Sequence, residues 1–296
     1  MKKSSVIASI ILISMAIVCT SNFVHADNVI TRVQGPAQGT LSGNSITVTL
    51  LQTPQSGDVL IAVMGLEVTD SNQPQVAPQI TQTGVNWPCL SHSFVSTGST
   101  SGSGIEVWWG IVNSATASRT ITIDLSHFSQ GSGSVTCATV NVCEYSGIDT
   151  SYITQSPYVD QTIDNKGTGT AIDTSNNGLF NDPVPTTVYA DELWVGGALL
   201  NGASQSTPTY GFTLVNDGAV YNGISVSYLE NIVSSVGQVE SGTTGASRGA
   251  WLITLATFPA ATSNFVLPES SIGALSAIIA FAASFAIWKK SKKPRI

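Results

Sequence analysis

Basic, histidine and cysteine side chains are scarce in this chain of 296 residues, which has 11 Lys and Arg, 3 His and 4 Cys. Between residues 27 and 268 the basic side chains are only Arg32, Arg119, Lys166 and Arg248, against seventeen Asp and Glu. The net charge of this segment is therefore −13. Because such a surface repels phosphate groups, we expect no nucleic acid among the partners.

A helical repeat of apolar residues is also missing between residues 27 and 259. Alternating or continuous apolar runs, separated by Gly- and Ser-rich turns, predict strands instead. The predicted strands cover residues 45–50, 58–65, 105–112, 119–125, 134–145, 191–200, 223–229 and 250–258. Many short strands of this kind predict an all-β fold, an antiparallel β-sandwich (jelly roll) that forms one domain over residues 27–259.

The apolar runs recur in a similar order in two halves of this domain. Four pairs of segments correspond: residues 57–61 with 190–196, 84–87 with 210–214, 105–109 with 224–228, and 134–142 with 250–257. The pattern predicts a domain built from two similar halves. Chance similarity is the alternative, because strands draw on the same few residue types.

The first residues have the order of a secretory signal peptide. Lys2 and Lys3 precede an apolar run over residues 6–19, and small or apolar residues lead up to Ala26. This order predicts a signal peptide over residues 1–26, cleaved between Ala26 and Asp27. The apolar run is short for a membrane span.

The last residues have the order of a membrane anchor. Residues 270–288 carry no charged side chain, and a helix of this length is about 28 Å long, close to the thickness of a bilayer core. Trp288 stands at its edge, and basic residues fill the tail 289–296. The positive-inside rule predicts a transmembrane helix over 270–288 and a cytoplasmic tail, with the domain 27–259 and the linker 260–269 outside the cell.

A short motif precedes this span. Leu267, Pro268, Glu269, the span and the basic tail together resemble the tripartite sorting signals of exported surface proteins. Leu267-Pro268-Glu269-Ser270 is similar to PEP-CTERM signals of the kind processed by archaeosortases. It is also similar to the LPxTG signal, but Ser270 and Ser271 stand where that signal has Thr and Gly. The resemblance implies processing at this motif, and a single-pass anchor that is never cleaved is the alternative.

The body carries a second resemblance. An Asp-led apolar strand at 58–65, a Gly-aromatic segment at 84–87 and a long strand that ends in Glu144-Tyr145 resemble the jelly-roll (concanavalin A-like) domains of bacterial and archaeal surface proteins. This resemblance implies a fold and no particular activity.

Cysteine and metal chemistry have few candidates. Cys137 and Cys143 lie in one predicted strand, too far apart to pair, so any disulfide involves Cys89. Three small buried side chains are the alternative. The segment 160–182 is rich in oxygen ligands and suits calcium, with candidate ligands Asp160, Asp164 and Asp173. Turn-forming Asp and Asn are the alternative there.

Catalytic patterns are weak. A G-x-S-x-G pattern at 245–249 leads into a strand and not into a helix, which is the wrong context for a nucleophilic serine. Glu106 and Glu144 fall on strands without the clustered carboxylates of glycosidases. Adjacent Trp108 and Trp109 point to opposite faces of their strand, so one is expected in the core. The other faces solvent as a sugar-stacking candidate or lies under a loop.

These observations predict a surface protein that is not an enzyme. Its expected role is structural, adhesive or ligand-binding, with glycans, envelope proteins and calcium as candidate partners. A surface glycoside hydrolase on the same fold and a fibre subunit are the alternatives. A fibre subunit would add residues 28–33 as a strand to a neighbouring copy.

Overall fold

The structure, a computed structural model, describes residues 29–69, 78–88, 91–96, 102–126, 134–154, 159–168, 171–174, 185–201, 207–216, 222–240, 242–244 and 250–261. They belong to one compact unit, Asn28–Ala261. The named elements in these ranges are all β-strands in antiparallel sheets, which confirms the predicted all-β class. The predicted signal peptide and membrane helix lie outside these ranges. Within them, no helix is both long and apolar enough to span a bilayer.

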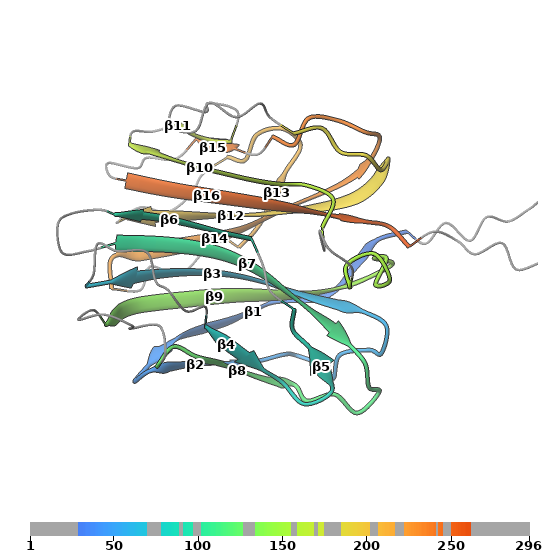
Figure 1. Ribbon diagram of the computed structural model, residues 1–296, viewed down its shortest axis with the longest axis horizontal. Helices are drawn as coiled ribbons and strands as arrows, with labels where there is room; N and C mark the ends of the chain where they lie inside the picture. Colours follow the sequence, from blue (N-terminus) through green and yellow to red (C-terminus); the bar gives the residue numbers. More distant parts are fainter. Residues whose placement is uncertain are drawn as a thin grey trace, which may run out of the picture. The chain divides into compact units, whose positions relative to one another are not determined.

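Two five-stranded arrangements form the centre of the fold (Figure 1). The first has the order β1-β9-β3-β7-β5. Its strands are β1 (Thr31–Ser42), β9 (Val135–Ser146), β3 (Val59–Val68), β7 (Gly102–Val112) and β5 (Val85–Asn86). The second has the order β10-β16-β12-β14-β13. Its strands are β10 (Thr162–Thr168), β16 (Ala250–Pro259), β12 (Asp191–Asn201), β14 (Ile224–Ser234) and β13 (Thr213–Asn216).

The first sheet continues past β1 into three further strands. The order of this extension is β4-β8-β2-β1, with β2 (Ser45–Thr49), β8 (Thr120–Asp124) and β4 (Gln79–Thr81). A short strand, β6 (Ser91–Ser96), also pairs with β7. A separate two-stranded sheet joins β11 (Ala171–Asp173) to β15 (Gly242–Thr244).

An irregularity in β1 interrupts its pairing with β9. The register between these strands shifts around Gln34 and Ala37, where a cis peptide bond joins Gly35 to Pro36. Gly35 has a φ of 109°, and a Cβ there would lie 2.6 Å from the Val142 carbonyl oxygen. Only glycine fits such a backbone at such an approach. Beyond this point β1 pairs with both β9 and β2, and so joins the extension to the first sheet.

The strands β3, β7 and β9 are buried on both faces. One face packs on the second sheet in a core that includes Val63, Trp109 and Tyr145 with Val195 and Phe258. The other face packs on the extension, in a core that includes Met64, Trp108 and Val140 with Ile46 and Ile121. The fold is therefore a β-sandwich with a third layer of strands over the outer face of the first sheet.

The strand order supports the predicted duplication. Each strand of the first sheet has a counterpart at the same position of the second: β1 with β10, β9 with β16, β3 with β12, β7 with β14, and β5 with β13. The correspondence read from the sequence is shifted by one residue in β3 and β12. Val59 and Leu193 both face the shared core, so Asp58 matches Glu192 and not Asp191. A one-residue shift exchanges the two faces of a strand.

Each strand predicted from the sequence begins within two residues of the start of an observed strand, with one exception. Strand β7 begins at Gly102 and not at 105. The sequence predicts no strand over 160–182. Strands β10 and β11 lie in this segment, and β10 pairs with β16 along its whole length. Its polar composition misled the prediction because β10 is an edge strand, which has fewer apolar neighbours to contact.

Candidate functional site

Both members of the Trp pair are buried. Trp109 is 1% exposed in the core between the two sheets, and its ring meets that of Phe258 edge-on at 5.7 Å. Trp108 is 4% exposed in the core beneath the extension. The sequence predicts one Trp in the core and the other either facing solvent or lying under a loop. Trp108 is covered, but by a layer of strands and not by a loop. Neither ring is on the surface, so the predicted sugar-stacking role of Trp108 and Trp109 has no geometric support.

Trp108 holds a buried carboxyl. Its indole Nε1 donates a hydrogen bond of 2.7 Å to Oε2 of Glu106, on the same face of β7. Burial raises the pKa of Glu106 to about 7, and the indole hydrogen bond opposes this rise. Glu106 is thus buried, and its Oε2 is engaged by the indole of Trp108.

A second buried carboxyl ties together the start of β1, the end of β9 and the turn before β3. Glu144 is fully buried and accepts hydrogen bonds from Gln34 Nε2 and, at 2.7 Å, from the backbone N–H of Gln55. It also contacts the Asp58 carboxyl. Burial, the hydrogen bond between the Asp58 and Glu144 side chains, and the negative charge of Glu144 raise the pKa of Asp58 to about 7. Gln34 is held in turn by the backbone of Gln52. Every oxygen of Glu144 therefore has an internal partner.

The second sheet has a matching carboxyl at the start of its central strand. Glu192 is fully buried and accepts a hydrogen bond of 2.9 Å from Trp194 Nε1. Burial is the largest cause that raises the pKa of Glu192 to about 8; contact with Asp160 raises it further, and the indole hydrogen bond lowers it. Asp160 also accepts a hydrogen bond of 2.7 Å from the backbone N–H of Val188. Asp58 and Glu192 thus occupy corresponding positions and each contacts another carboxyl.

The predicted calcium ligands are not brought together. Asp160 bonds the backbone of Val188 and contacts Glu192. Asp164 of β10 lies opposite Thr254 of β16, and Asp173 is the last residue of β11. No group of three or more His, Cys, Asp or Glu side chains within the described ranges could hold a metal ion. Calcium stays a prediction without a site.

Cys137 and Cys143 lie in the single strand β9, as predicted, and form no disulfide with each other. Both are buried, and burial raises the pKa of each thiol to about 12. Several other sequence-predicted features lie outside the described residues. These are Cys89, the serine pattern at 245–249, and the processing residues Ala26, Asp27, Leu267, Pro268, Glu269 and Ser270.

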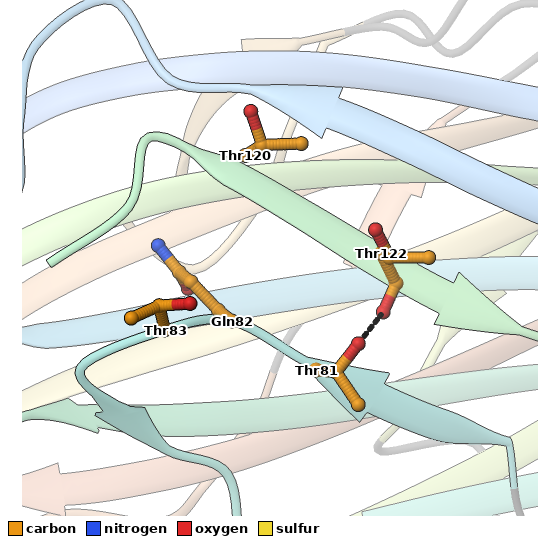
Figure 2. Close-up of a pocket in the computed structure, with 5 residues that line it drawn as sticks. All are labelled: Thr81, Gln82, Thr83, Thr120 and Thr122. Carbon is orange, nitrogen blue, oxygen red and sulfur yellow. Dashed lines mark hydrogen bonds between the residues drawn. The ribbon is translucent and has the colours of Figure 1, made fainter.

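The extension carries an exposed threonine surface with a hollow of about 390 Å³ (Figure 2). The lining residues are Thr120 and Thr122 of β8, Thr81 of β4, and Gln82 and Thr83 just after it. Thr81 Oγ1 donates a hydrogen bond of 3.4 Å to the Thr122 carbonyl oxygen. None of the lining side chains is ionisable, so the hollow offers hydroxyl donors and acceptors without acid or base groups.

Two threonines of β2 extend this surface. Thr47 and Thr49 of β2 are exposed and lie opposite Thr122 and Thr120 in the sheet. The half-buried Trp87 packs against the core beneath the extension, and its Nε1 donates a hydrogen bond of 3.3 Å to Oε1 of the buried Gln82.

Sequence reasoning missed this surface although a signal was present. Thr-x-Thr occurs at 47–49, 81–83 and 120–122, and alternation in a strand places both threonines on one face. The pairing of these segments in one sheet could not be deduced from the spacing. The contacts of Asp58 with Glu144 and of Asp160 with Glu192 were missed for the same reason.

The chain was compared with protein-family models, curated proteins and solved structures, and nothing matches it in any of the three comparisons.

Proposed function

We propose that the chain is a cell-surface protein with a jelly-roll-type β-sandwich, anchored by residues 270–288, that binds neutral glycans without turning them over. The observation that carries the binding role is the threonine hollow on β8 and β4. Hydroxyl groups both donate and accept hydrogen bonds, which suits the hydroxyl groups of a sugar. Thr47 and Thr49 of β2, which lie opposite Thr122 and Thr120, add two exposed hydroxyl groups to this surface.

The placement of the carboxyl groups supports binding over hydrolysis. Glycosidases need two carboxyl groups that face one substrate across a cleft. Here Glu106, Glu144 and Glu192 are buried, and each is engaged by internal hydrogen bonds. None of them lines the hollow.

A glycan array probed with the full chain in detergent tests the binding role. The double variant Thr81→Val, Thr122→Val keeps side-chain shape and removes two hydroxyl groups. We expect it to weaken binding about tenfold, since each lost hydrogen bond costs about 0.5–1.5 kcal/mol. Thr213→Val, an exposed threonine of β13 in the other sheet, is the matched control and should bind like the parent chain. Equal binding by the double variant would contradict the proposal.

Protease treatment of intact cells that display the chain tests the anchor. The body should be degraded, and a fragment from Ser270 to the C-terminus should remain unless a sorting enzyme has removed it. A body that is protected in intact cells would contradict display on the surface.

A further inference from the structure

Both ends of the described domain leave from the same end of the sandwich. Strand β1 begins where β9 ends, since Thr31 pairs with Ser146, and β16 ends beside them (Figure 1, right). Ala261 donates its backbone N–H to the Gly147 carbonyl oxygen, and a Cβ on Gly147 would lie 2.7 Å from the Val29 carbonyl oxygen. We call this the terminal end of the domain.

Exposed apolar side chains gather at the terminal end. Val29 is 66% exposed, and Val33 follows at the start of β1. Leu51 is next to Gln52, which binds Gln34 of β1. Val188, 68% exposed, and Tyr189 precede β12, where Asp191 accepts a hydrogen bond from Ala260.

The last strands of the second sheet add to this surface. Ile232 pairs with Leu193 near the start of β12, and Val236 follows the end of β14. Tyr210 accepts a hydrogen bond through its carbonyl oxygen from Asn231 of β14. Together with the residues named above, these are the large apolar side chains that are exposed in the described ranges. All of them lie at the terminal end. At the opposite end, the β1–β2 hairpin presents Ser42, Gly43 and Asn44.

The charges at the terminal end are largely engaged within the domain. Arg32 and Glu230 form an ion pair of 2.8 Å, and Tyr145 donates a hydrogen bond of 2.7 Å to Glu230. Asp149 accepts hydrogen bonds from Ser151 and Tyr152. Asp191 stays exposed, and the domain as a whole is acidic. Such a surface suits an apolar contact with uncharged or zwitterionic groups better than a contact with anions.

We propose that the terminal end rests on the lipid surface of the bilayer in which the chain is anchored, with Val29, Val188, Tyr189 and Ile232 against zwitterionic headgroups. This inference rests on the anchor of the proposed function. Only eight residues, 262–269, separate the domain from the uncharged run, and they span at most about 28 Å when extended. Contact through a second copy would require the terminal ends of two copies to meet. In one bilayer the terminal ends of two anchored copies both face the membrane, which favours contact with lipid over contact with a second copy.

The test is photo-crosslinking of the full chain in phosphatidylcholine vesicles. The photoreactive residue p-benzoylphenylalanine replaces Val188 in one variant and Asn44, in the hairpin at the opposite end, in the control. We expect lipid adducts at position 188 and not at 44, detected by mass spectrometry of the peptides. Adding Tyr189→Asp and Ile232→Asp should cause loss of the adducts at 188, because charges do not enter the headgroup boundary readily. Vesicles with anionic lipid should give fewer adducts than phosphatidylcholine alone.

Four results would overturn the inference. Equal adducts at 188 and 44, or adducts that persist with both Asp substitutions, would show unspecific labelling. Crosslinked dimers at 188 in place of lipid adducts would assign the surface to a second copy. No adducts at 188, while residues 270–288 are protected from protease by the vesicle, would remove the docking and leave the anchor. Loss of that protection itself would contradict the proposed anchor.

Discussion

The two sheets of the sandwich share a strand order but differ on their outer faces. The outer face of the first sheet is covered by β2, β8 and β4, which expose threonines. The outer face of the second sheet buries the indoles of Trp194 and Trp251 in two smaller clusters. Both central strands begin at a buried carboxyl contact, at Asp58 and at Glu192. The comparison indicates that the paired sheets supply the core, whereas the three added strands supply the surface proposed for binding.

The largest effects are expected for the two tryptophans that lie on opposite faces of β7. Trp109→Ala removes one large side chain from the core between the sheets, and Trp108→Ala removes one from the core beneath the added strands. Each should lower the free energy of unfolding by about 3–5 kcal/mol, measured by urea denaturation. The Trp108→Ala loss should be larger at pH 8 than at pH 5, because Glu106 loses the hydrogen bond that favours its charged form. The Trp109→Ala loss should not depend on pH. The same pH dependence in both variants would contradict this account.

The stability of the parent chain should depend on pH through three buried or partly buried carboxyl groups, those of Asp58, Glu106 and Glu192. The folded-state pKa values of Asp58, Glu106 and Glu192 are raised to about 7, 7 and 8, above their unfolded values near 4. The folded state therefore binds more protons, and stability is highest below pH 4 for these groups and falls as the pH rises to 8. For buried Glu106 the loss is about 3 kcal/mol.

Glu106→Gln and Glu192→Gln test these two contributions separately. Each variant should show a smaller loss of stability between pH 4 and pH 8 than the parent chain, measured as the urea midpoint at each pH. Two variants with the parent's full pH dependence would show that these carboxyl groups are not its source.

Two glycines test the close approach of the sheets. A Cβ on Gly65 of β3 would lie 2.3 Å from Val226 Cγ2, and a Cβ on Gly197 of β12 would lie 2.1 Å from Val63 Cγ1. Gly65→Ala and Gly197→Ala should therefore each cost about 1–3 kcal/mol of stability. Gly237→Ala is the control, since a Cβ there has its nearest neighbour at 3.6 Å. An equal effect at all three positions would contradict the close packing of Gly65 on Val226 and of Gly197 on Val63.

The smallest effect is expected for the cysteines of β9. Iodoacetamide should leave Cys137 and Cys143 unmodified in the folded chain, because both are buried and their thiol pKa values are raised to about 12. Peptide mapping after denaturation checks this, with alkylation in urea as the positive control. A peptide that links Cys137 to Cys143 would contradict the single strand β9.

The sequence was sufficient for the strands whose apolar residues are continuous or alternate. Strands β3, β7, β9, β12, β14 and β16 were predicted because their residues contact a core on one or both faces. Strand β1 was missed because Gly35, Pro36 and Gly39 interrupt its pattern, and β10 because its composition is that of a loop. The candidate site was missed because it depends on which strands pair. Thr81 and Thr122 are 41 residues apart, and local spacing does not reveal that contact.

The central claim is that the domain binds without turnover, and product analysis tests it most directly. The full chain is incubated with each glycan that it retains on the array, from pH 4 to pH 8, and the mixtures are analysed by mass spectrometry. The account predicts intact glycans at every pH, because the carboxyl groups of Glu106 and Glu144 lie in the interior and not at the threonine hollow. Cleaved glycans that disappear with Glu106→Gln or Glu144→Gln would contradict it.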